Sequence, residues 1–107
     1  MVADAAALTV RRYLRALQAA GIQARRGVVF GSHARGEAGP WSDIDLVVIA
    51  PELESPPERR LVDKLWQLRA ATDARIEPIP CGQREWETDG TRPILEVARR
   101  EGVAIEG

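Results

Sequence analysis

Two aspartates, Asp43 and Asp45, are separated by one residue at the start of the apolar run that ends at Ile49. If that run is a strand, residues i and i+2 point to the same face, so the two carboxylates project side by side. Adjacent carboxylates repel each other unless a positive charge lies between them. A divalent metal ion that carries a nucleoside triphosphate is the natural candidate, because hard cations prefer carboxylate oxygens.

A glycine–serine pair, Gly31 and Ser32, lies ten residues before the first aspartate and directly after another apolar run. Gly31 lets the backbone approach a phosphate without a Cβ atom in the way. The Ser32 hydroxyl and the N–H groups of the turn that follows can then hydrogen-bond the β- and γ-phosphates. Arg35 lies one turn further along, where its guanidinium can make a forked contact with the same anion. Otherwise Arg35 is an ordinary exposed arginine.

Nucleotidyl transfer needs two divalent ions, which are held by two or three carboxylates. Glu77 is the best third carboxylate, because it lies between Ile76 and Pro78 in an otherwise apolar segment. Its expected roles are to hold the metal and to take the proton from the attacking hydroxyl. The alternative is a surface acid that pairs with Arg75. Similarly, Asp43 and Asp45 could form a solvated strand start.

The elements that must position these residues alternate along the chain. We expect helices at 4–20, 55–72 and 91–101, strands at 25–30, 43–49, 75–80 and 103–105, a single helical turn at 32–36, a loop at 37–42, and an irregular segment or short helix at 83–90. Pro78 and Pro80 lack an N–H group, which favours an edge position for their strand. This order predicts a small mixed sheet with helices packed against it, an α/β (α+β) fold.

Three polar residues are expected to cap these helices. Asp4 and Thr91 precede helical patterns, and Ser55 is followed by Pro56 and, three residues after it, by Glu58. A serine cap with proline at the first helical position and glutamate at the third is typical of a helix start.

Length, charge and cysteine content indicate the domain organisation, the partners and the location to expect. The 107 residues predict a single domain, 1–107. A net charge of −1 gives no basic field, so direct nucleic-acid binding is not expected. Cys81 is the only cysteine, and no apolar run is long enough for a membrane span, so we expect a cytoplasmic protein with no membrane contact. His33, a lone histidine that we expect to be exposed, is left out of the catalytic set.

The motif Gly31-Ser32, ten residues, Asp43-Ile44-Asp45 resembles the signature of the DNA polymerase β-like nucleotidyltransferase superfamily. Ala34-Arg35-Gly36 and Ser42 make the chain similar to its minimal nucleotidyltransferases. Ile94-Leu95-Glu96 and Arg100-Glu101-Gly102-Val103 are similar to their C-terminal helix and strand. Many relatives carry aspartate where this chain has Glu77.

The resemblance implies a polymerase β palm-like fold and a metal-dependent transfer of AMP from ATP to a hydroxyl. It implies that Asp43, Asp45 and Glu77 are catalytic and bind two Mg²⁺ ions, with Mn²⁺ as a substitute. It also implies that Gly31, Ser32, Arg35 and Ser42 bind the nucleotide. Such proteins often pair with a separately encoded all-helical HEPN protein, which in some pairs is a ribonuclease toxin. The resemblance therefore leads us to expect that this chain is the antitoxin of a toxin–antitoxin pair.

Larger members carry a helical domain that binds the acceptor, so we expect a partner or a second copy, as in a homo-oligomer, to complete the acceptor site. Two other functions stay open. One is a non-catalytic module that neutralises a HEPN ribonuclease sterically. The other is an aminoglycoside-type enzyme that modifies a small molecule.

Overall fold

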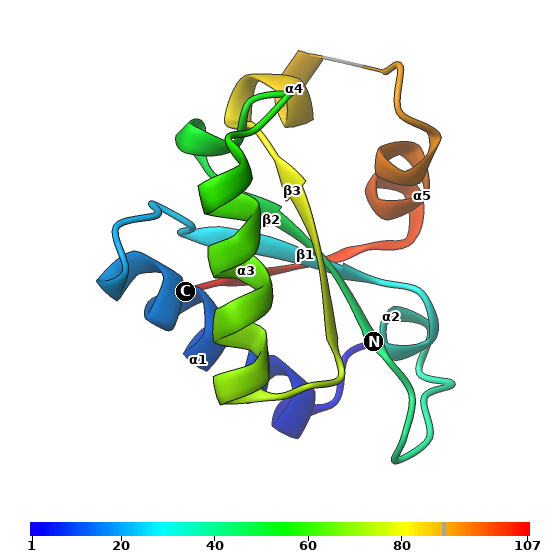
Figure 1. Cartoon of the computed structure of the whole chain (residues 1–107). Coiled ribbons are helices and arrows are strands. Elements are labelled where there is room, and N and C mark those ends of the chain that lie inside the picture. The colour runs from blue at the N-terminus through cyan, green and yellow to red at the C-terminus, as the bar shows by residue number, and fades with distance from the viewer. Residues whose placement is uncertain (89) are drawn as a thin grey trace.

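The computed structural model describes residues 1–88 and 90–107. The elements are α1 (Asp4–Ala19), β1 (Arg26–Phe30), α2 (Ser32–Arg35), β2 (Ile44–Ile49), the 3-10 turn η1 (Pro51–Leu53), α3 (Arg59–Thr72), β3 (Ile76–Cys81), α4 (Gln83–Thr88), α5 (Pro93–Glu101) and β4 (Val103–Glu106). Figure 1 shows this order as the expected alternation of helices and strands. Within the expected segment 83–90, α4 is the short helix, and Asp89 lies outside the described residues.

The strands form one mixed sheet in the order β3-β2-β1-β4. β1 runs antiparallel to both β2 and β4, whereas β2 and β3 are parallel. A parallel pair needs a crossover connection, and α3 provides it between β2 and β3. The prediction of a small mixed sheet with packed helices is therefore confirmed.

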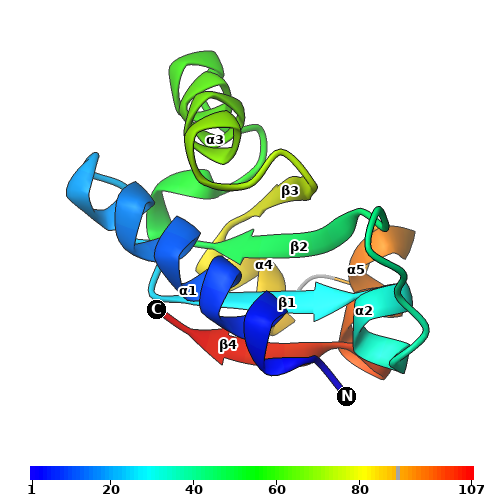
Figure 2. The same cartoon turned by 90° about the horizontal axis from the view of Figure 1, so that it is seen from below.

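Helices cover the two faces of the sheet separately. Alternate residues of β2 point to opposite faces, so Leu46 and Val48 pack with the apolar residues of α1 and α3. Val47 and Ile49 pack instead with Leu95 and its neighbours on α5. Figure 2 shows α1 and α3 together on one side of the sheet. The face that carries α4 and α5 is the face to which the odd-numbered residues of β2 point.

The prolines of β3 explain its place at the edge. The N–H of Ile44 donates to the carbonyl of Arg75, and the N–H of Ala50 to that of Cys81. The odd-numbered residues of β3 therefore turn their backbone groups toward β2. Backbone direction alternates along a strand, so Pro78 and Pro80 face the free edge, where a missing N–H removes no ladder hydrogen bond. The predicted edge position of this strand is confirmed.

The expected helix caps are wrong. The helix predicted from Ser55 begins at Arg59, because Pro57 disfavours helical geometry at the preceding Pro56 and Glu58 is extended. Asp4 is itself the first residue of α1, and Ala3 holds the cap position.

The last long helix also starts later than expected. Arg92, and not Thr91, precedes α5, because Pro93 has the fixed φ that suits a first helical position. The helix expected at 4–20 ends at Ala19, and Gly21, just after the capping residue Ala20, has a φ of 93° that suits a helix end.

None of the helices in residues 1–88 and 90–107 has both the length and the apolar character that crossing a membrane requires.

Tyr13 connects the two helices that cover one face of the sheet. Its side chain is fully buried in α1, and its hydroxyl donates to the carbonyl of Leu65 in α3 over 2.7 Å. We expect Tyr13→Phe to lower the free energy of unfolding by about 1 kcal/mol in urea denaturation, because a buried carbonyl loses a hydrogen-bond donor. Thr88→Val is the control, since it removes an exposed hydroxyl-to-carbonyl bond of the same length. Equal effects of the two substitutions would contradict the stabilising role of the buried hydrogen bond between Tyr13 and Leu65.

Candidate active site

The structure brings Asp45 and Glu77 together on neighbouring strands. The two residues are register partners in the parallel pair of β2 and β3. Asp45 points to the same face as Val47 and Ile49, and Glu77 to the same face as Ile79 and Cys81, which is the face that carries α5. Asp43 lies just before β2. The three carboxylates predicted from sequence are therefore neighbours at one end of the sheet.

The electrostatics of Asp45 reflect this crowding. Burial raises the pKa of the Asp45 carboxyl, and the nearby carboxylates of Asp43 and Glu77 raise it further. His33 and Arg35 act on this pKa in the opposite direction, but their effect is smaller. Burial and two neighbouring acids disfavour the charged form of this carboxylate. A cation bound beside it would therefore stabilise its charge. The pairing of Glu77 with Arg75 is wrong, because Arg75 binds Asp73 over 2.8 Å and lowers its pKa.

The donor set suits a hard divalent cation, since the three side chains offer only carboxylate oxygens. In the described part of the chain, however, no three acidic, histidine or cysteine side chains already converge on a single point as a finished metal site. Asp43, Asp45 and Glu77 would therefore need rotamer changes to share an ion.

Gly31 connects β1 to α2 directly beside Asp45. Phe30, the last residue of β1, is the register partner of Asp45. Gly31 has a φ of 73° and a ψ of −150°, a backbone conformation that is nearly exclusive to glycine. A Cβ atom at this position would also collide with the Asp45 carboxylate. Ser32 follows as the first residue of α2, so the predicted turn lies beside the predicted acids.

Arg35, at the end of α2, is already bound to two carboxylates. Its Nε lies 2.5 Å from Glu37, and its Nη1 lies 3.3 Å from Glu101. Glu101 also accepts the N–H of Gly31 over 3.0 Å. Sequence reasoning missed Glu101 as a residue of this site. No local pattern could have found it, because the contact joins residues 70 positions apart.

The loop between the two halves of the motif is held by its own hydrogen bonds. The Ser42 hydroxyl accepts the N–H of Gly39 over 2.9 Å. His33 was expected to be exposed, but it is buried, and its Nε2 lies 3.2 Å from the Ser42 carbonyl. Arg75 donates to the carbonyl of Pro40 over 3.4 Å. In this structure Ser42 and His33 therefore shape the loop that leads into Asp43.

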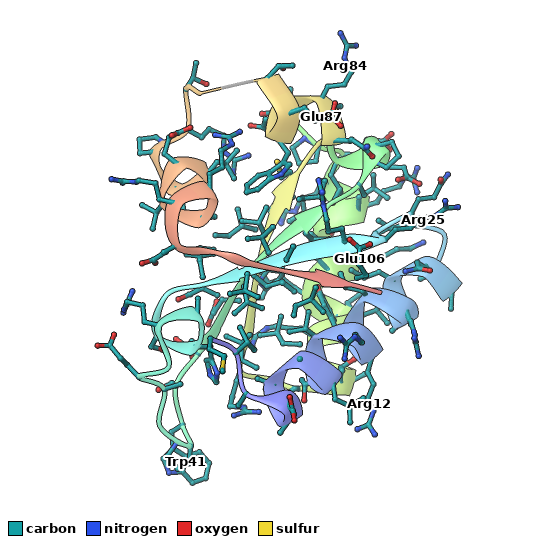
Figure 3. All side chains as sticks on the ribbon, turned by 180° about the vertical axis from the view of Figure 1, so that it is seen from behind. Arg12, Arg25, Trp41, Arg84, Glu87 and Glu106 are labelled. Carbon is teal, nitrogen blue, oxygen red and sulfur yellow. The ribbon has the colours of Figure 1, made fainter. Side chains whose placement is uncertain are left out.

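Trp41 projects from this loop. Its side chain is 91% exposed, and Figure 3 shows it at the tip of the loop, away from the body of the molecule. A large, exposed aromatic side chain on a hydrogen-bonded loop is a suitable anchor for another molecule, because it offers a large apolar area to bury on contact.

Two glycines with positive φ test the special position of Gly31. We expect Gly36→Ala to cost about 1 kcal/mol of unfolding free energy, since its φ of 74° is strained for alanine but the nearest atom is 3.8 Å away. Gly31→Ala should cost about 3 kcal/mol or more, because strain adds to the collision with Asp45. Chemical denaturation measures both. Equal costs would show that the Asp45 carboxylate does not require glycine here.

The raised pKa of Asp45 predicts a pH-dependent stability in metal-free buffer. The folded state holds the Asp45 proton more tightly than the unfolded state, so this stabilising contribution is present at low pH and is lost as the pH rises through the raised pKa. At pH 7, Asp45→Asn should therefore unfold at a higher urea concentration than the unmodified protein. The difference should shrink below about pH 4, where an unperturbed aspartate is protonated.

Asp63→Asn is the control for this experiment, because Asp63 is an exposed residue that pairs with the exposed side chain of Arg59. It should change stability by less than about 0.5 kcal/mol. An Asp45→Asn protein that is less stable at neutral pH would contradict the crowding of carboxylates at this site.

Comparison with known proteins identifies the family. The family model for the nucleotidyltransferase domain matches residues 10–88. No curated protein matches the sequence. A Sulfolobus solfataricus protein provisionally described as a nucleotidyltransferase has a similar structure, with a TM-score of 0.59 and 15% identity over 92% of this chain and 77% of that one. A toxin–antitoxin structure with AMP-PNP has a TM-score of 0.59 and 21% identity over 91% of this chain and 73% of that one. The family match covers more than half of the chain, so this protein belongs to the nucleotidyltransferase domain family.

Proposed function

We propose that this nucleotidyltransferase transfers AMP from ATP to a hydroxyl group of a partner protein, and that the partner is a HEPN toxin for which the chain is the antitoxin. The single observation that carries the proposal is that Asp45 lies near both Asp43 and Glu77 and directly beside Gly31. That arrangement puts acidic ligands next to a backbone turn at which a triphosphate can bind. The similar toxin–antitoxin structure contains AMP-PNP, which supports both the nucleotide and the class of partner.

In the proposed reaction, the acceptor oxygen attacks the α-phosphorus of ATP. A new O–P bond forms, the bond between the α-phosphorus and the bridging oxygen breaks, and pyrophosphate leaves. Glu77 takes the proton of the attacking hydroxyl, because it is the half-exposed acid of the group on the edge strand. The proposed roles of Gly31, Ser32 and Arg35 are to hold the phosphates that leave, with Ser42 supporting the loop beside them.

Asp43, Asp45 and Glu77 are the residues that would hold Mg²⁺, or Mn²⁺ in its place. When bound, such ions stabilise the negative charge that develops on the attacking and leaving oxygens. The neighbouring carboxylates and the raised pKa of Asp45 support this assignment, because both indicate a place where added positive charge is favourable.

The acceptor is proposed to be a protein because of the surface beside the motif. Trp41 lies two residues before Asp43 and is almost fully exposed. A partner that contacts this side chain would be positioned near the proposed site of transfer. The alternative acceptor, a small molecule such as an aminoglycoside, gives no reason for an exposed tryptophan at the tip of the loop.

The central test is AMP transfer from ATP labelled at the α-phosphate to the co-purified partner. Asp43→Ala combined with Asp45→Ala should abolish labelling and the AMP mass increments on the partner, because it removes two of the three carboxylates. The matched control is Asp63→Ala with Glu87→Ala, which removes two exposed acids from helices outside the site. Circular dichroism checks that both proteins fold.

Undiminished labelling by the double aspartate variant would end the catalytic proposal. The same variant also separates catalysis from steric neutralisation. If it protects cells from the toxin as well as the unmodified chain does at equal concentration, then binding alone is the antitoxin activity.

A further inference from the structure

One carboxylate contacts both groups that the proposed function assigns to the phosphates. Glu101 accepts the N–H of Gly31 over 3.0 Å through Oε1. Both of its oxygens lie 3.3 Å from Nη1 of Arg35. A backbone N–H group and a guanidinium both donate to this one carboxylate. The same two donors could hold a phosphate oxygen. The carboxylate of Glu101 thus sits in an anion cradle, which we define as the Gly31 N–H and the Arg35 guanidinium.

The fold brings Glu101 to this cradle. It is the last residue of α5, its side chain contacts Arg35 of α2, and Figure 2 shows the two helices close together. The next residue, Gly102, fits so closely that a Cβ atom would collide with the Ala98 carbonyl and with Val28 of β1. The end of α5 therefore lies tightly against β1, whose chain continues directly into Gly31.

The ion pair between Arg35 and Glu101 is weak enough for a stronger anion to replace the carboxylate. The side chains of Arg35 and Glu101 are 48% and 28% exposed, and exposed ion pairs contribute little to stability. Their separation of 3.3 Å is longer than the roughly 2.8 Å of a strong charge-assisted bond. Glu101 also lies at a helix C-terminus, where the helix dipole disfavours a negative charge. The acid is thus stabilised by the cradle and not by its own helix.

We propose that Glu101 occupies the phosphate site of the nucleotide-free protein and that the β- or γ-phosphate of a nucleoside triphosphate displaces it. Glu101 then sets the affinity for the nucleotide, because binding must break its contacts with Gly31 and Arg35. This inference rests on the proposed function. A triphosphate carries several negative charges against the single charge of the carboxylate, so it competes effectively for the same donors.

The displaced side chain has a place to go. Glu101 lines a surface hollow of about 310 Å³ together with Val97 and Arg100. Rotation into this hollow would take the carboxylate away from Arg35 and toward a surface that Arg100 also lines. Moving the Glu101 side chain out of the cradle should therefore cost the protein little free energy.

Isothermal titration with AMP-PNP and Mg²⁺ tests the proposal on the full chain. Glu101→Gln keeps the shape of the side chain but removes its charge, so Kd should fall by about threefold to tenfold as the competing charge-assisted contact weakens. Glu101→Ala removes the competitor entirely and should tighten binding at least as much. In the transfer assay, KM for ATP should fall for both variants.

Glu96→Gln is the matched control, because it removes one charge from the same helix at a residue that pairs with Arg99 outside the cradle. Its Kd should stay at the unmodified value, and an equal tightening would reduce the effect to net charge and overturn the proposal. Unchanged or weaker binding by both Glu101 variants would also overturn it and make Glu101 a fixed support of the turn. If the unmodified chain binds no nucleotide, the proposed function itself fails, and this inference falls with it.

Discussion

The crowding of carboxylates around Asp45 is the constraint on which the rest of the structure depends. Burial and two neighbouring acids disfavour its charge, so the fold must bring these groups together against their repulsion. The parallel pairing of β2 with β3 does this, because its register places Glu77 opposite Asp45. The backbone hydrogen bonds and the apolar faces of the two strands supply the stabilisation that the acids themselves do not.

The same constraint accounts for the arrangement of the elements around the site. A parallel strand cannot follow β2 through a tight turn, so the chain must cross over through α3 before Glu77 can reach its place. The proline residues of β3 then fit only at the free edge, where their missing N–H groups leave no partner unsatisfied. Glu77 is in consequence carried on the outermost strand, where an incoming hydroxyl could reach it.

Sequence was sufficient for the parts of the site that depend on local spacing. The turn at Gly31 and the edge position of β3 each follow from a few adjacent residues, and the structure agrees with them. The strand expected from Asp43 begins instead at Ile44, so of the two aspartates only Asp45 lies on β2. Helix boundaries near proline were wrong, because the restriction that Pro57 places on Pro56 outweighs the serine cap signal at Ser55.

Contacts between distant parts of the chain were beyond sequence reasoning. Nothing near Glu101 or Gly31 indicates that the end of α5 reaches the turn after β1, since that contact arises only from the packing of α5 on the sheet. The burial of His33 was missed for the same reason. Its neighbour is the Ser42 carbonyl, which the folded loop brings to it.

Gly31 is the point at which the acidic residues and the proposed anion cradle meet. A Cβ atom on this residue would collide with the Asp45 carboxylate, whereas its N–H donates to Glu101. A cation held by the acids and an anion held by the cradle would therefore lie on two sides of one residue. Opposite charges so placed would stabilise each other, which relieves the repulsion among the acids and strengthens the hold on the phosphates. The glycine is thus required twice, once for the close approach of Asp45 and once for the backbone direction that opens the cradle.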